Sequence, residues 1–97
     1  IATNTTVARD AVANLPHGAE TGGLSGAPLT TKAQAVTTQL AAALAGAVPV
    51  IGVGGIMSGA DAAARITAGA SLVQLYTGLV YAGPALVVDC VKAIHKA

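Results

Sequence analysis

Short apolar runs separated by glycine-containing turns dominate the second half of the chain. Residues 48–53 and 72–76 are two such runs, and neither contains a charged side chain. Strands of a parallel sheet that is covered on both faces are continuous apolar runs of this kind. Each run is followed by a glycine turn and then by a segment with helical character. This order predicts two successive parallel βα units.

The first half of the chain predicts one strand end, one long loop and one helix. Residues 1–3 are typical of the end of a buried strand, and residues 7–29 show no sustained periodicity. Loops of that length are uncommon in compact domains and are usually functional or disordered. Apolar residues then recur every four positions, which predicts a helix over residues 31–45. Its apolar positions and its stop signal are Val36, Leu40, Leu44 and Gly46.

Two further helices follow the two apolar runs. Ser58 can cap the first of them, with Asp61 three residues later near the positive end of the helix dipole. This helix is expected to end near residue 68. The last helix is expected to start at the Gly83-Pro84 pair, because proline is favoured in the first turn. Its predicted inward stripe consists of Val87, Cys90, Val91 and Ile94.

Composition narrows the class of protein. The chain has 97 residues, 54% of them hydrophobic but only two aromatic, so each buried position removes little area from water. We therefore expect a thin core, and we expect the chain to begin inside a longer protein. The formal net charge is +1 and the basic residues are scattered, which excludes a nucleic-acid footprint. The single cysteine excludes an internal disulfide and a cysteine-rich metal site.

Two long uncharged segments, residues 33–60 and 66–88, are long enough to span a bilayer. The first contains Pro49 and five glycines, and the second contains Pro84 and three. Such breakers favour helix, turn, buried strand and turn over one continuous helix. We therefore predict a soluble chain without a transmembrane segment. The start of the chain also lacks the pattern of a signal peptide.

Residues 50–59, "VIGVGGIMSG", contain two adjacent glycines, and three kinds of glycine-containing binding loop can be compared with them. A dinucleotide fingerprint fails because Met57 occupies the third glycine place, and a P-loop fails because no lysine follows. The phosphate site of a (β/α)8 barrel fits, since it is built from the loops after two successive strands. Gly55 and Gly78 occupy matching places in two such loops. The alternative is that these glycines only allow close packing of strand and helix.

Other candidate groups favour structural roles. His17 and His95 have no ligand partners at metal-binding spacing, and Cys90 is typical of a small core residue. Arg9, Asp10 and Glu20 lie in the long loop, where they either brace it or face a substrate. No Ser/His/Asp or Cys/His set is visible. The chain thus offers binding groups and no evident catalytic ones.

Four motifs carry a family resemblance. They are "TNTTVARD" (residues 3–10), "ETGGLSGAPL" (20–29), "PVIGVGGIMSGADA" (49–62) and "AGASLVQLYTGLVYAGPAL" (68–86). Together they resemble the C-terminal part of quinone-dependent, class 2 dihydroorotate dehydrogenases, which are FMN-dependent (β/α)8 barrels. The resemblance implies an α/β fold holding part of a TIM barrel. Residues 1–97 would be an incomplete domain with the end of strand six and βα units seven and eight.

The resemblance also implies which residues bind ligands. Asn4 and Thr5 match positions that hydrogen-bond the pyrimidine, dihydroorotate or orotate. Asn can offer both a donor and an acceptor to such a ring. The positions implied to contact FMN, at the flavin, the ribityl chain or the phosphate, are Thr3, Ser25, Gly26, Gly54, Gly55, Tyr76 and Thr77.

The implied function is oxidation of dihydroorotate to orotate in pyrimidine synthesis, with a quinone as acceptor. No residue of this chain matches the serine base of the family, so no catalytic residue is assigned. The quinone site and the membrane-associating helices would also lie upstream, which implies a full-length enzyme peripheral to a membrane. The isolated chain is expected to be inactive, needing the rest of the barrel. Two alternatives remain: a class 1 or other FMN-binding barrel, or a non-catalytic βα module that self-associates.

Overall fold

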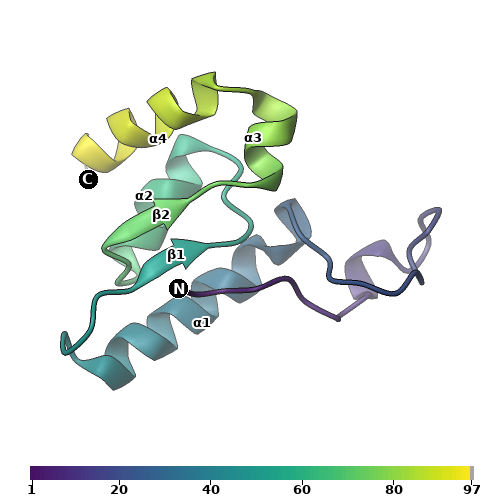
Figure 1. The fold of residues 1–97 in the computed structure, drawn as a ribbon, viewed down its shortest axis with the longest axis horizontal. Coiled ribbons are helices and arrows are strands. Elements are labelled where there is room, and N and C mark those ends of the chain that lie inside the picture. The colour runs from purple at the N-terminus through teal and green to yellow at the C-terminus, as the bar shows by residue number, and fades with distance from the viewer. Residues whose placement is uncertain (97) are drawn as a thin grey trace.

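The computed structural model describes residues 1–96 as an α/β chain with two parallel strands (Figure 1). The predicted alternation of strand and helix is confirmed, although both strands are shorter than expected. The elements in chain order are two 3-10 helices (Asp10–Val12 and Ala27–Leu29), α1 (Thr30–Leu44), β1 (Ile51–Val53), α2 (Gly59–Thr67), β2 (Leu72–Gln74), α3 (Thr77–Ala82) and α4 (Ala85–Lys96).

The sheet orders three chain segments side by side. β1 pairs with β2 in parallel, with Gly52 opposite Val73. On the other side of β1, Ala2 forms a parallel bridge with Gly52. The N–H groups of Ala2 and Thr3 donate to the carbonyls of Ile51 and Val53 at 2.9 and 2.7 Å. The strand end predicted at residues 1–3 is therefore a bridge to β1, and all three segments end at the same edge.

The helix ends follow from local chemistry. The Ser58 hydroxyl accepts the Asp61 N–H at 3.1 Å, as predicted for a cap. The Asp61 carboxylate in turn accepts the N–H of Met57 at 3.0 Å, one residue earlier than in the standard capping box. At the end of α1, Ala45 adopts the left-handed conformation with φ 49°. Side chains and turns thus satisfy backbone groups that the helices leave free.

The core lies between α2 and α4, where Ile56, Ala62, Leu86 and Cys90 are buried. The predicted stripe of α4 is half wrong. Cys90 and Ile94 face the core, but Val87 and Val91 are 46% and 62% exposed. The residues of α4 that face the core are instead Leu86, Cys90 and Ile94, which are spaced four apart. This spacing places them on one side of the helix, the side that packs against α2.

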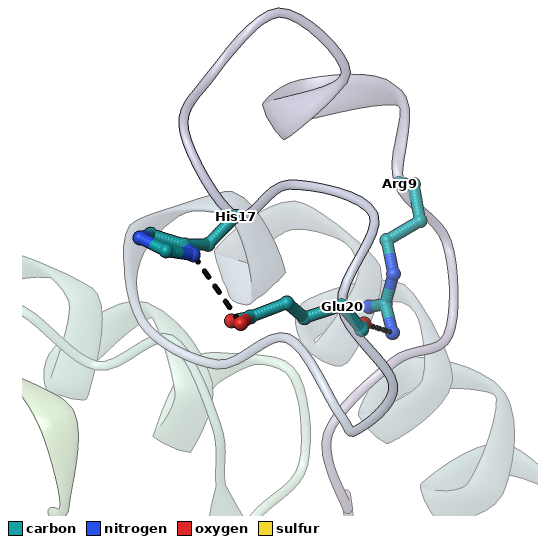
Figure 2. Close-up of polar contacts among 3 residues, drawn as sticks. All are labelled: Arg9, His17 and Glu20. Carbon is teal, nitrogen blue, oxygen red and sulfur yellow. Dashed lines mark hydrogen bonds and ion pairs between the residues drawn. The ribbon is translucent and has the colours of Figure 1, made fainter.

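The long loop of residues 7–29 extends away from the strands (Figure 1). An antiparallel bridge between Thr6 and Leu24 closes residues 7–23 of this loop. The Arg9 guanidinium donates to the carbonyls of Glu20, at 2.9 Å, and Gly22. The His17 Nδ1 lies 3.2 Å from the Glu20 carboxylate (Figure 2). Of the two roles considered for Arg9, the structure therefore supports bracing of the loop.

The helices of residues 1–96 include none that combines the length and apolar character needed to cross a bilayer.

Candidate functional site

A pocket of about 510 Å³ opens at the carboxyl ends of the three paired segments. Ligands of open α/β sheets bind at this edge, where loops from successive strands meet. All nine predicted binding positions line the pocket. They are Thr3, Asn4, Thr5, Ser25, Gly26, Gly54, Gly55, Tyr76 and Thr77. The structure thus brings together groups from four loops, and their contacts with flavin and pyrimidine remain predictions.

Close contacts between the loops shape the pocket. The hydroxyls of Ser25 and Thr77 are 2.8 Å apart, which joins the long loop to the start of α3. A side chain at Gly26 would lie 3.0 Å from the Thr77 methyl group, and one at Gly78 would overlap the carbonyl of Ile56. Small residues at these points therefore let the three loops converge.

Gly54 and Gly55 are required by the protein itself. Their φ angles are +106° and +70°, in the region that side chains rarely adopt. An added Cβ at Gly54 would lie 2.9 Å from Leu29, and at Gly55 it would overlap the backbone of Thr30. Close packing, the alternative interpretation of the double glycine, accounts for both positions. These two glycines are therefore no evidence for phosphate binding, which has to be argued from other features of the pocket.

Free backbone amides are one such feature. Within residues 1–96, the N–H groups of Gly55, Tyr76 and Thr77 have no protein acceptor, whereas the N–H of Gly54 faces β2 in the ladder that pairs Val53 with Gln74. Unpaired amides in successive turns form concavities that bind anions. The described part of the chain contributes no charged side chain to the pocket wall. An anion here would therefore be held by amides and hydroxyls.

The Asn4 side chain makes a local hydrogen bond that defines its orientation. Its Oδ1 accepts the backbone N–H of Thr5 at 2.8 Å, and because that N–H can only donate, the atom facing it must be oxygen. The Nδ2 group donates to no acceptor within residues 1–96, so Asn4 keeps two donors for a ligand while part of its acceptor capacity is used by Thr5. This geometry suits a ligand rich in carbonyl or carboxylate oxygens.

Three polar residues near the pocket were not predicted from the sequence. Gln74 lines it from the end of β2, and a polar residue inside an apolar strand was the signal for it. The Thr30 hydroxyl donates to the carbonyl of Gly55, and Arg65 donates to the carbonyl of Gly54 at 2.8 Å. Arg65 is the one basic residue in "ADAAARITAG", which was its only signal.

Cys90 takes no part in the pocket. Its side chain is 3% exposed, and its Sγ lies 3.8 Å from the carbonyl of Ser58. Burial raises the pKa of the Cys90 thiol, and the nearby carboxylates of Asp89 and Asp61 raise it further. A neutral buried thiol is a poor nucleophile. The predicted role as a core residue is confirmed.

Parallel βα units with a glycine-lined pocket at their carboxyl edge are typical of α/β proteins that bind ligands at that edge. The chain belongs to the dihydroorotate dehydrogenase family, whose model matches residues 1–97. It is 65% identical over 96 residues to "Dihydroorotate dehydrogenase (quinone)" of Burkholderia thailandensis, and 63% identical to that of Burkholderia pseudomallei. These alignments cover 99% of this chain and 28% of each relative. The chain therefore spans about 28% of the length of the curated relatives it matches.

Solved structures agree with this assignment. The dihydroorotate dehydrogenase of Eimeria tenella in complex with ferulenol matches with a TM-score of 0.88 and 38% identity. The match covers 96% of this chain and 25% of that one. The ligand-free form of the Eimeria tenella protein gives a TM-score of 0.89 and covers 97% and 26%. The α/β arrangement is thus that of part of a dihydroorotate dehydrogenase.

Proposed function

We propose that this chain forms part of an FMN-dependent enzyme that oxidises dihydroorotate to orotate and passes the electrons to a quinone. The observation that carries the proposal is the convergence of nine family-like positions on one pocket at the strand ends. Its share of the enzyme is the FMN phosphate site and some of the orotate contacts. The full-length enzyme would be peripheral to a membrane, with the quinone bound outside these residues.

The residues present fit a phosphate ester. The free amides after β1 and β2 supply donors without side chains in the way, and the hydrogen-bonded Ser25 and Thr77 hydroxyls leave one O–H free to donate. A bound flavin would supply the hydride-accepting chemistry. The chain's own contribution is to bind and orient, since preorganised donors lose little freedom on binding.

The pyrimidine would lie against Asn4 and Thr5. The free Nδ2 donors of Asn4 match the carbonyl and carboxylate oxygens of orotate. The Thr5 hydroxyl lies 3.5 Å from the Asn4 Oδ1, which keeps the two side chains together. In the proposed barrel, Ala2 would end strand six, and β1 and β2 would be strands seven and eight.

A hybrid enzyme tests this function. The 96 matched residues would replace the corresponding segment of the Burkholderia thailandensis relative, which is 65% identical. We expect the purified hybrid to bind FMN, to bind riboflavin more weakly, and to reduce a quinone when dihydroorotate is added. Flavin fluorescence titration and a quinone-reduction assay provide the readouts, and the unmodified relative is the control. A folded hybrid that binds no flavin would contradict the proposal.

The isolated 97 residues are expected to show no turnover. Two strands and one bridge leave β2 with an open edge, and such edges tend to pair with other chains. Val80 and Tyr81 are 81% and 80% exposed, which favours association as a second candidate behaviour of the isolated chain. The measurements are dye reduction with dihydroorotate and added FMN, and sedimentation with and without FMN. Turnover above background would refute this expectation. Discrete oligomers without bound flavin would favour the alternative of a non-catalytic βα module that self-associates.

A further inference from the structure

Arg65 is a fully buried arginine directly behind the pocket. Its relative exposure is 0%, and it reaches from α2 past β1 to the loop after that strand. Its Nη2 donates to the carbonyl of Gly54 at 2.8 Å, and its Nε donates to the Gln34 Oε1 at 3.0 Å. The Gln34 amide donates in turn to the carbonyl of Ala64 at 2.9 Å. Arg65 is thereby held from both sides.

This burial is not explained by stability alone. The Nη1 of Arg65 is buried without a hydrogen-bond partner in residues 1–96, so part of its desolvation is uncompensated. Burial lowers the pKa of the Arg65 guanidinium, while the carboxylate of Asp61 acts in the opposite sense. An apolar side chain of similar volume often stabilises a core as well as a buried charge does. The buried guanidinium is therefore better explained by the groups that its hydrogen bonds orient.

Gly52 provides the space that Arg65 occupies. A Cβ at Gly52 would lie 2.6 Å from the Cγ of Arg65 and 3.2 Å from the Cβ of Ala70. The φ angle of Gly52 is not in the left-handed region, so conformation alone does not call for glycine there. The space left by the missing side chain at Gly52 is thus filled by the aliphatic part of the Arg65 side chain.

Peptide geometry links Arg65 to the pocket. The bond between Gly54 and Gly55 is trans, so the Gly54 carbonyl and the Gly55 N–H point in opposite directions. Because Arg65 holds that carbonyl on the helix side, the Gly55 N–H is directed away from Arg65. Gly55 lines the pocket, and its N–H has no protein acceptor in the described chain. The Thr30 hydroxyl holds the next carbonyl, that of Gly55, in the same way.

We propose that Arg65 is a positioning residue for phosphate recognition: through its bond to Gly54 it orients the Gly55 N–H toward an anion in the pocket. The inference rests on the proposed FMN site and deepens it. Arg65 does not touch the ligand in this mechanism. Its loss should therefore weaken binding of the phosphate group and leave the flavin ring contacts intact.

The test compares FMN with riboflavin, which lacks the phosphate, in the hybrid enzyme without substrate. Arg65→Met is expected to weaken FMN binding by about tenfold to a hundredfold, the range for loss of a charge-assisted hydrogen bond. Riboflavin binding should change by less than about twofold, within the range of neutral substitutions. Arg65→Lys should fall between wild type and Arg65→Met, because lysine keeps a donor but not the fork that reaches two acceptors. Lys92→Met, at an exposed position of α4, is the matched control and should change neither ligand.

Each outcome decides between distinct possibilities. Equal losses for FMN and riboflavin in Arg65→Met would show a merely structural role and overturn the inference. A wild-type hybrid that binds FMN no better than riboflavin would instead refute the proposed phosphate site. Should Arg65→Met not fold, Gln34→Leu decides, since it frees the Nε of Arg65 and should selectively weaken FMN binding by about threefold, as for a neutral hydrogen bond. Unchanged FMN selectivity in Gln34→Leu would overturn the inference.

Discussion

Replacing Gly55 by alanine is expected to abolish measurable FMN binding by the hybrid enzyme, a loss of at least about a hundredfold. The left-handed φ of +70° costs a side chain about 1–2 kcal/mol. The new Cβ would also overlap the backbone of Thr30, which cannot move without shifting the start of α1. The loop must therefore rearrange, and the free N–H of Gly55 would lose its present direction. Titration of the hybrid with FMN measures the effect.

Gly46→Ala is the matched control for this substitution. Gly46 has a comparable φ of +82°, but nothing lies within 4 Å of the position that its Cβ would take. We expect a loss of about 1 kcal/mol in unfolding free energy from the conformation alone, and no change in FMN affinity. Wild-type FMN affinity in Gly55→Ala would contradict the account of the loop. A similar loss of affinity in Gly46→Ala would show that strain anywhere in the chain is sufficient.

Asn4→Asp is expected to lower kcat/KM for dihydroorotate by about a hundredfold or more, as sites built on hydrogen bonds reject the wrong partner strongly. The carboxylate can still accept the N–H of Thr5, so the local turn should persist. The two Nδ2 donors disappear, and a negative charge takes their place opposite an anionic substrate. FMN affinity should remain within about twofold of wild type, as expected for a group that does not face the phosphate. Steady-state kinetics and flavin titration of the same preparation separate the two effects.

Asn14→Asp controls for the chemical change itself. Asn14 is exposed in the long loop and lines no part of the pocket, so the same substitution should leave kcat/KM unchanged. If Asn4→Asp behaves like Asn14→Asp, Asn4 does not bind the pyrimidine. If FMN affinity falls in parallel with kcat/KM, the substitution has disturbed the whole pocket and Asn4 has no selective role.

Local signals along the sequence predicted most of the secondary structure. The Ser58 cap with Asp61 depends on atoms within a few residues, and the structure has it as expected. The stop of α1 is also local, although its left-handed cap residue is Ala45, one position before the predicted Gly46, which itself has a φ of 82°. The buried face of α4 was predicted only in part. Its valines and leucine are equally apolar, so the choice among them depends on where α2 lies.

The βα order, most helix ends and, through the motifs, the membership in the dihydroorotate dehydrogenase family could all be inferred from the amino-acid sequence. The reason why Gly55 must be glycine required the three-dimensional structure, because the atoms that exclude its Cβ belong to Thr30, which lies 25 positions away. The structure alone brought Arg65 behind Gly54 and assigned the Asn4 oxygen to Thr5. Such contacts depend on how separate elements pack together, and periodicity or capping within one segment carries no information about that.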